Sequence, residues 1–435
     1  MATRRRQRGM AVVLAALVLL VAAGLFLASA LTGLAFVPER DAASDRAIAQ
    51  AREALIAYAA DRPIDAAVGP GYLPCPDRDD DGWAEATCGS LSGDSGQGQR
   101  LGRLPWKTLG LPDVRDGHGE RLWYAVSSKH KGLLNCAASR GCVDMSPPVA
   151  LGTISVRDAA GTLLHDGTQS DPGLAERGGA AAVVLAPGPP LERRSGPVLE
   201  QKRECLPGEC DANGYCVREE AAHCIAANFL DAAPAEDNAA FRDRNDAAGR
   251  AGNRDGFIAG PVTDGAGRPV VNDRLAAIGY ADLMPRVMAR VALEAALCLR
   301  AQAARTAGGR YPQPEPACGT TAPYGRLPEF AAPGLEGCNL AASSPQPAWW
   351  TTWQAHVLYA PAAAFLPGGN GSCEAPGGCL EAIDSQGRVV ARDKRFALVV
   401  TRRANECGSE RLRCDARTCR QVVLGDGIDV ARAFP

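Results

Sequence analysis

Sixteen cysteines in 435 residues constrain this chain more than any other feature of its sequence. Disulfides persist in oxidising compartments, whereas the cytosol keeps thiols reduced, so this number is too high for a cytosolic protein without metal clusters. We therefore expect an exported, disulfide-rich protein. The spacing of cysteines does not determine the full pairing, but close neighbours are candidates for short-loop bridges. The candidate pairs are Cys75 with Cys88, Cys136 with Cys142, and Cys373 with Cys379.

One group of four cysteines and a histidine offers a second interpretation, a zinc site. Structural zinc sites usually separate paired ligands by about two to four residues, and the separations here are wider. We therefore favour disulfides for this group as well. Its members are Cys205, Cys210, Cys216, Cys224 and His223.

The charge balance argues against one class of partner. The chain has 47 basic and 49 acidic residues, a formal net charge of −2. Proteins that bind nucleic acid concentrate positive charge on one face, so we expect no nucleic-acid partner. The sequence also has neither a Walker A loop nor a dinucleotide-binding fingerprint in a strand–turn–helix context. We find no catalytic constellation in it and expect that the protein is not an enzyme.

The first 37 residues have the pattern of a membrane anchor. Four arginines lie within residues 1–9, and an uncharged, mostly apolar stretch then runs from Met10 to Val37. About 20 apolar residues suffice to cross a bilayer as a helix, and arginines flank the cytoplasmic side. We expect a basic leader (1–9), a transmembrane helix (10–37) and a single-pass inner-membrane protein, with its C-terminal bulk in the periplasm or on a surface filament. A cleaved secretory signal is the alternative, because Ala28-Ser29-Ala30 fits a signal peptidase site.

The apolar pattern continues beyond this stretch as an amphipathic one. From residue 40 to residue 62, apolar side chains such as Ile48, Leu55 and Tyr58 recur at steps of three and four residues. This spacing places them on one face of a helix, which predicts that the helix packs against a globular head. Strands are predicted after it at residues 121–127, 150–156 and 180–186.

This layout resembles that of type IV pilins and pseudopilins. Gly9 followed by the apolar run is similar to a prepilin cleavage site, and the segments 73–77 (LPCPD) and 102–106 (GRLPW) are similar to those of Cys-rich pilin-like proteins. The resemblance covers residues 1 to about 190 and implies cleavage after Gly9 by a prepilin peptidase and methylation of Met10. It also implies assembly with other pilins or pseudopilins through an inner-membrane platform. Pilins usually carry a glutamate at the fifth mature position, which here is Leu14. This departure fits a minor subunit at a filament tip, and it fits an ordinary signal anchor equally well.

The order of elements repeats in the second half of the chain. Residues 282–305 predict a second amphipathic helix, and Gly-Arg-Leu-Pro at 325–328 has the same sequence as 102–105. A strand is predicted at 396–401. We expect an α+β fold: a long N-terminal membrane-spanning helix that continues into a pilin-like head, a helix packed on an antiparallel sheet, with a second similar head in tandem. The predicted parts are a first head (38–194), a Cys-containing insertion or linker (195–272) and a second head (273–435).

One acidic loop has the spacing of a calcium ligand set. Residues 77–82 read Asp-Arg-Asp-Asp-Asp-Gly, with carboxylates at loop positions 1, 3 and 5 and the turn glycine at 6. Oxygen ligands in this pattern suit a structural Ca²⁺, the one cofactor that we expect. Position 12 is Cys88 instead of the usual bidentate glutamate, and a solvated acidic turn is the alternative. The candidate ligands are Asp77, Asp79, Asp81 and Glu85.

These observations predict a structural protein, a minor pilin or pseudopilin of a type IV pilus or a type II secretion-like filament, at the tip or in initiation. The alternative is a single-pass, membrane-anchored periplasmic binding protein that is not part of a filament.

Overall fold

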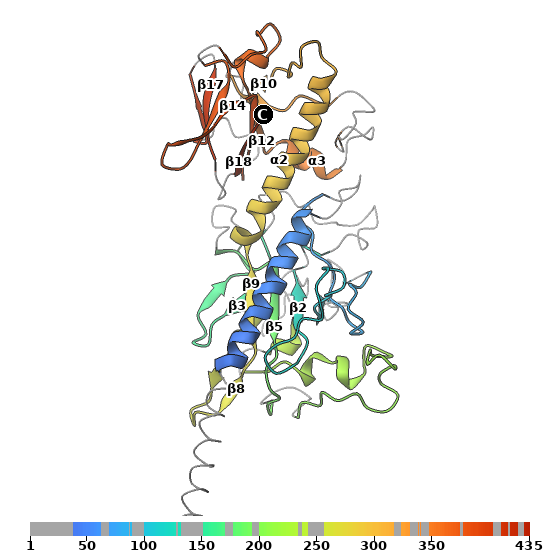
Figure 1. Cartoon of the computed structure of the whole chain (residues 1–435). Coiled ribbons are helices and arrows are strands. Elements are labelled where there is room, and N and C mark those ends of the chain that lie inside the picture. Colours follow the sequence, from blue (N-terminus) through green and yellow to red (C-terminus); the bar gives the residue numbers. More distant parts are fainter. Residues whose placement is uncertain are drawn as a thin grey trace, which may run out of the picture.

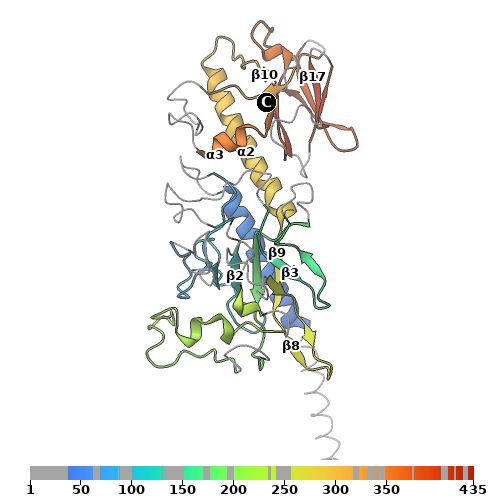
Figure 2. The same ribbon diagram turned by 180° about the vertical axis from the view of Figure 1, so that it is seen from behind.

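The computed structural model shows an elongated molecule in which two antiparallel sheets follow one another along the long axis, each with a helix across one face (Figure 1). Figure 2 shows the same two sheets and their helices from behind. The structure describes residues 38–435 apart from 62–68, 87, 89–99, 128, 132–150, 170–176, 194–199, 234–236, 242–255, 317–322, 331–337, 339, 341–347, 375–376, 403–409, 416–417 and 425–429.

The first sheet lies under the helix formed by residues 38–61. Its central strand β5 is buried along its whole length. Val184 packs into the core beneath this helix, with Leu55, whereas Val183 packs on the opposite face with Phe229 and Phe257. Alternate residues of a strand face opposite sides of a sheet, so β5 is apolar throughout because both faces are covered. The strands, in spatial order, are β1 (Leu101–Arg103), β2 (Trp123–Val126), β5 (Ala182–Ala186) and β9 (Arg274–Ile278).

The second sheet lies under helix α2 (Tyr280–Ala304), which buries Met284, Val287 and Val291 on its inner face. Every pair of neighbouring strands is antiparallel, as in the first sheet. The strands are β10 (Glu315–Pro316), β11 (Gly325–Arg326), β12 (Val357–Pro361), β15 (Phe396–Val400) and β18 (Val430–Phe434).

Smaller elements complete the described chain. A further sheet in the second half contains β14 (Val389–Lys394), β13 (Leu380–Ile383), β17 (Cys419–Val423) and β16 (Leu412–Cys414). In the first half, β4 (Leu163–His165), β3 (Ser155–Arg157) and β6 (Gly256–Ile258) form one sheet, and β7 (Val262–Thr263) and β8 (Pro269–Val271) form another. The short helices are α3 (Ala348–Gln354), η5 (Ala222–Cys224), η6 (Ala226–Asn228), η7 (Asn238–Ala240) and η8 (Ala363–Phe365).

The two main sheets pair their strands in the same register. Gly102 lies opposite Tyr124 in the first sheet, and Gly325 lies opposite Tyr359 in the second. The repeated Gly-Arg-Leu-Pro sequence therefore begins at equivalent positions of the two sheets. From these positions, the spatial order β1-β2-β5-β9 corresponds to β11-β12-β15-β18.

The two paired tyrosines also make equivalent hydrogen bonds. The hydroxyl of Tyr124 donates to the carbonyl of Pro74 at 3.0 Å, and the hydroxyl of Tyr359 donates to the carbonyl of Pro312 at 3.1 Å. Each bond joins the sheet to the proline-containing segment that follows the helix. The buried phenol thus has a partner, which offsets the cost of removing its hydroxyl from water.

The two paired glycines explain why that segment can lie so close to the sheet. A Cβ atom on Gly102 would lie 2.4 Å from the carbonyl oxygen of Asp77, and one on Gly325 would lie 2.0 Å from that of Glu315. Both separations are below van der Waals contact. Only glycine leaves room for the crossing backbone at these two positions.

Helix 38–61 and α2 are joined by ion pairs and by a shared core. Arg52 pairs with Asp282, and Glu53 lies 2.6 Å from Arg286. The buried side chains beneath the two helices belong to one continuous hydrophobic cluster. The two halves are therefore packed against each other.

Six disulfides lie within the described part of the chain. Cys75–Cys88 closes the acidic loop of the first half, and Cys298–Cys338 ties α2 to the segment that precedes α3. The others are Cys205–Cys210, Cys216–Cys224, Cys373–Cys379 and Cys414–Cys419. Cys136 and Cys142 lie outside the described residues.

The expected fold class, with a long membrane-spanning helix at its centre, was wrong. Within the described residues most of the regular elements are β-strands, with three α-helices, and none of these helices is long and apolar enough to cross a bilayer. Neither of the two long described helices can span, because helix 38–61 and α2 are amphipathic, with one face buried and charged side chains such as Arg52 and Arg286 on the other. Against the expected localisation as a single-pass inner-membrane protein stands the same finding, that no helix of the described residues could cross a bilayer. The predicted leader (1–9, with Gly9 and Met10) and the predicted span (10–37) lie outside the described residues.

Candidate functional site

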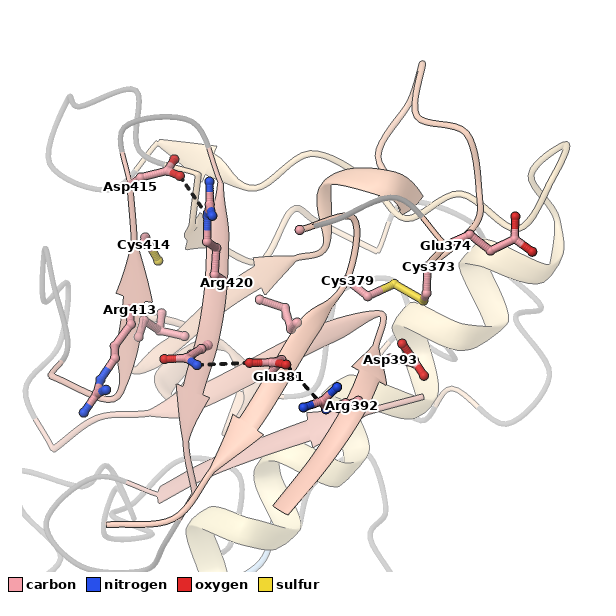
Figure 3. Close-up of a pocket in the computed structure, with 14 residues that line it drawn as sticks. Cys373, Glu374, Cys379, Glu381, Arg392, Asp393, Arg413, Cys414, Asp415 and Arg420 are labelled. Atoms are coloured by element: carbon pink, nitrogen blue, oxygen red, sulfur yellow. Dashed lines mark hydrogen bonds and ion pairs between the residues drawn. A yellow bond between two sulfur atoms is a disulfide. The ribbon is translucent and has the colours of Figure 1, made fainter. Parts of the chain in front are cut away.

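A charged cleft of about 1020 Å³ lies on the sheet of the second half that is formed by β14, β13, β17 and β16 (Figure 3). Two of its acidic side chains pair with basic ones. Glu381 lies 3.6 Å from Arg392, and Asp415 lies 3.2 Å from Arg420. The cleft is open, and its mixed charges suit a polar ligand better than a strongly charged one.

The acidic loop, residues 77–85, lies at the edge of the first sheet. The Cys75–Cys88 disulfide brings its two ends together. Its first residue, Asp77, is anchored to β1, since its N–H donates to the carbonyl of Arg103 at 3.0 Å and its carbonyl accepts the N–H of Arg103 at 2.6 Å. At the other end, the N–H of Glu85 donates to the carbonyl of Pro76 at 3.3 Å. The loop is thus closed covalently and by backbone hydrogen bonds.

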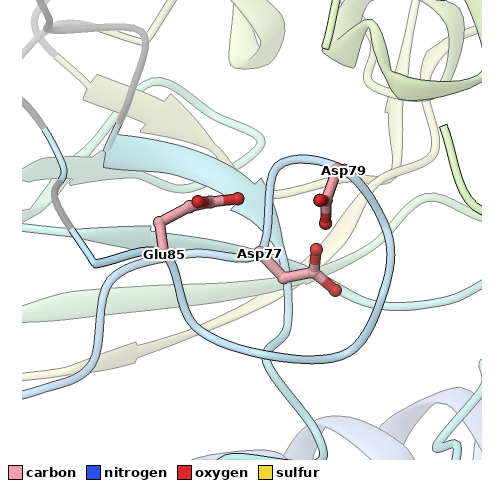
Figure 4. Close-up of side chains that lie close together, drawn as sticks. All are labelled: Asp77, Asp79 and Glu85. Atoms are coloured by element: carbon pink, nitrogen blue, oxygen red, sulfur yellow. The ribbon is translucent and has the colours of Figure 1, made fainter. Parts of the chain in front are cut away.

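Three carboxylates of the acidic loop converge on one point. Oxygens of Asp77, Asp79 and Glu85 lie within 4.8 Å of one another, and Figure 4 shows the three side chains turned towards each other. Asp81, the fourth candidate from the sequence, is not in this cluster. Its Oδ1 accepts the N–H of Trp83 at 2.7 Å instead. Of the four candidates from the sequence, Asp77, Asp79 and Glu85 (loop position 9) therefore form the cluster, whereas Asp81 (position 5) does not.

One oxygen of each clustered carboxylate accepts a backbone hydrogen bond within the loop. Asp77 Oδ2 accepts from Gly82 N at 2.7 Å, Asp79 Oδ1 from Asp81 N at 3.3 Å, and Glu85 Oε1 from Arg78 N at 3.2 Å. These bonds fix the orientation of the carboxylates. The second oxygen of each has no hydrogen-bond partner among the described residues and remains for a further ligand.

Asp77 is the least solvated member of the cluster, with none of its surface exposed. Burial raises the pKa of Asp77 from its ordinary value of 3.8 to about 8, and the charges of Asp80, Asp81 and Asp79 act in the same direction. The N–H of Gly82 acts in the opposite direction. A negative charge on Asp77 is therefore unfavourable unless a cation compensates for it.

Asp80 faces the opposite side of the loop. Its φ of 65° turns the chain there, and its buried carboxylate lies 2.9 Å from Arg121, 3.2 Å from His223 and 3.8 Å from Arg103. Burial alone would raise the pKa of Asp80, but the hydrogen bond with His223 and the charges of Arg103 and Arg121 lower it. The sequence interpretation missed this network. One signal for it was available in the sequence, because successive side chains can lie on opposite sides of a loop. Here the side chains of residues 77 and 79 face one side and that of residue 80 faces the other.

The side of the loop that carries Asp80 receives residues 205–224, named here the stapled segment for its disulfides Cys205–Cys210 and Cys216–Cys224. The N–H of Cys216 donates to the carbonyl of Asp79 at 2.8 Å, and His223 reaches Asp80. Arg78 pairs with Glu219, and Lys107 donates both to the carbonyl of Asp81 and to the hydroxyl of Tyr215. The four cysteines of the zinc alternative are therefore consumed by disulfides.

The equivalent position of the second half lacks an acidic loop. The backbone of Glu315 lies opposite that of Arg326 in the sheet, as the backbone of Asp77 lies opposite that of Arg103. Unlike Asp77, however, Glu315 is exposed. The next residues in the chain are Pro316 and Ala317. The carboxylate cluster thus belongs to the first half.

Comparison with models of known protein families, with curated proteins and with solved structures finds no match to this chain.

Proposed function

We propose that this chain is a structural subunit, a minor pilin or pseudopilin of a type IV pilus or a type II secretion-like filament. The observation that carries the proposal is the repeated arrangement of a helix across an antiparallel sheet, with the same strand order and the same Gly–Tyr register in both halves. A helix packed on an antiparallel sheet is also the arrangement of a pilin head. The disulfides are in keeping with an exported protein.

A position at the filament tip or in initiation suits the shape of the molecule. The second sheet extends the protein beyond the first along its long axis (Figure 1). A subunit of this bulk is difficult to repeat within a regular filament. Leu14, in place of the glutamate that usually pairs with a neighbouring subunit, supports the same position.

The test concerns processing and assembly together. Gly9→Trp should block cleavage of the precursor and remove the protein from sheared surface filaments, while the control Gln7→Trp should be cleaved normally. N-terminal sequencing and immunoblotting of the filament fraction measure both results. An unchanged mature N-terminus in Gly9→Trp would contradict the proposal.

The charged cleft of the second half favours one other function, a binding protein that acts outside any filament. In that case, the protein is present in cells at a normal level but is missing from purified filaments. The same fractionation therefore separates the two functions.

A further inference from the structure

We propose that the acidic loop binds one Ca²⁺ through Asp77, Asp79 and Glu85, and that the bound ion stabilises the docking of the stapled segment. This inference holds whether or not the protein assembles into a filament. It rests on the geometry of the carboxylates, on one buried oxygen, and on the contacts that the same loop makes outwards.

The geometry of the carboxylates fits a single ion. Ca²⁺ binds its oxygen ligands at about 2.3–2.6 Å, so two ligands of one ion lie at most about 5 Å apart. The oxygens of Asp77, Asp79 and Glu85 satisfy this limit, because all lie within 4.8 Å of one another. The backbone hydrogen bonds described above already hold the three side chains in this arrangement.

Asp77 Oδ1 provides the second, independent observation. This atom is fully buried and accepts no hydrogen bond from any residue that the structure describes. It belongs to the carboxylate that faces Asp79 and Glu85 (Figure 4). A buried carboxyl oxygen without a partner is costly, and a cation at the centre of the cluster supplies one.

The basic side chains around the loop are engaged elsewhere. Arg103 and Arg121 lie on Asp80, on the other side of the loop. Arg78 pairs with Glu219, and the Lys107 ammonium donates to the carbonyl of Asp81. The described surroundings thus give Asp80 ion pairs with basic side chains but give none to the three converging carboxyl groups.

The ligand types select Ca²⁺ among the common cations. The nearby cysteines, Cys75 and Cys88, form a disulfide, so no thiolate is available from them for zinc. Three carboxylates in an irregular loop supply hard oxygen ligands without imposed octahedral geometry, which suits Ca²⁺ better than Mg²⁺. Backbone carbonyls and water would complete the coordination.

The backbone of Asp79 and Asp80 links the proposed ion site to the stapled segment. The side chain of Asp79 faces the cluster, while its carbonyl accepts the N–H of Cys216. The next residue, Asp80, reaches His223. An ion that holds Asp77, Asp79 and Glu85 therefore holds the outward groups that receive the stapled segment.

Binding is tested on the full-length chain, first stripped with EDTA. Tb³⁺, a luminescent substitute for Ca²⁺, is titrated with excitation of tryptophan, because Trp83 lies within the loop. Ca²⁺ should then displace it with an affinity of about 10⁻⁴–10⁻³ M. Asp79→Asn and Glu85→Gln should each weaken binding about tenfold or more. Asp81→Asn, the matched control in the same loop, should bind as the wild type does.

Two results would overturn the site. One is a wild-type chain that takes up neither ion, and the other is an Asp81→Asn variant that loses binding as fully as Asp79→Asn. The first result requires no variant, so a folding defect in Asp79→Asn or Glu85→Gln cannot hide it.

The link to the stapled segment is tested by hydrogen exchange of residues 205–224 in the wild-type chain. If opening of this segment releases the ion, Ca²⁺ at ten times its dissociation constant should slow the exchange about tenfold relative to EDTA. Exchange at equal rates in Ca²⁺ and EDTA would refute the link. In Asp79→Asn, the same addition of Ca²⁺ should slow the exchange no more than about twofold.

Discussion

Replacement of Asp80 by asparagine should destabilise the first half of the molecule severely. Asp80 is the counter-ion of Arg103, whose side chain is only 3% exposed. Burial lowers the pKa of Arg103 to about 10, so this side chain remains charged at neutral pH. Asparagine preserves the size of the side chain and can still accept a hydrogen bond from Arg121. The substitution therefore removes the negative charge while keeping the shape.

The expected loss follows from the burial of the pair. Removing one partner of a buried ion pair typically costs about 3–5 kcal/mol, because the other charge stays buried without compensation. Arg103 keeps some support, since it donates to the carbonyl of Arg121 at 3.2 Å and lies over Trp123 and Phe229. We therefore expect the lower end, about 3 kcal/mol. Asp113→Asn is the matched control: Asp113 also pairs with Arg121, at 3.0 Å, but its side chain is 30% exposed. It should cost no more than about 1 kcal/mol.

Hydrogen exchange of strand β2 measures the difference, because slow amides in a central strand report unfolding of the surrounding core. A loss of about 3 kcal/mol corresponds to exchange about 100-fold faster, since each 1.4 kcal/mol is about a factor of ten. Asp113→Asn should accelerate exchange about fivefold at most. Strand β15 of the second sheet serves as the internal reference. If Asp80→Asn accelerates β2 no more than Asp113→Asn does, then the network around Asp80 is not the support that its burial indicates.

Two further changes test other parts of the fold. Gly325→Ala places a Cβ atom 2.0 Å from a neighbouring backbone oxygen and should cost about 1–3 kcal/mol, whereas Gly265→Ala, with nothing within 4 Å, should be nearly neutral in thermal melting. Equal melting temperatures would contradict the close approach. Burial raises the pKa of both Asp231 and Asp273 above the ordinary value of 3.8. Above that pH the folded state binds more protons than the unfolded state, so this pair makes stability fall as the pH rises. Asp273→Asn should therefore lose less melting temperature than the wild type between about pH 4 and about pH 6.5, and calorimetry that shows parallel curves would refute this.

The helices could be predicted from the sequence because their signal is local. The segment predicted at 282–305 is observed as α2, residues 280–304, and the one predicted at 40–62 is observed as helix 38–61. Apolar residues recur every three or four positions there because only one face of each helix is buried. The apolar run of β5 was visible for the same kind of reason, since both of its faces are covered.

The strand pairing was much harder to predict. Strand β9 pairs with β5 across almost ninety residues, and three of its residues pair as Ala182 with Ile278, Val183 with Ala277 and Val184 with Ala276. Local composition carries no information about such a partner. The segment 195–272 has the polar composition of a linker, yet its Phe229 and Phe257 cover one face of the first sheet. Two aromatic residues in a polar segment are too weak a signal to indicate that packing.

The candidate metal cluster was predicted in part. Spacing indicated Asp77, Asp79 and Glu85, which the structure brings together. It also indicated Asp81, whose side chain accepts the N–H of Trp83. The difference arises because the turn at Asp80, with its positive φ, redirects the chain after the second ligand. That turn depends on Arg121 and other residues distant in the sequence, which spacing alone cannot indicate.

The continuous core beneath helix 38–61 and α2 has a mechanical consequence. Two bodies joined by a slack tether would reorient independently, and a load on one would first straighten the tether. Here, tension applied at the far end of the molecule passes directly through interlocked side chains into the near end. The two halves should therefore respond to a load as one stiff body and not as two tethered ones.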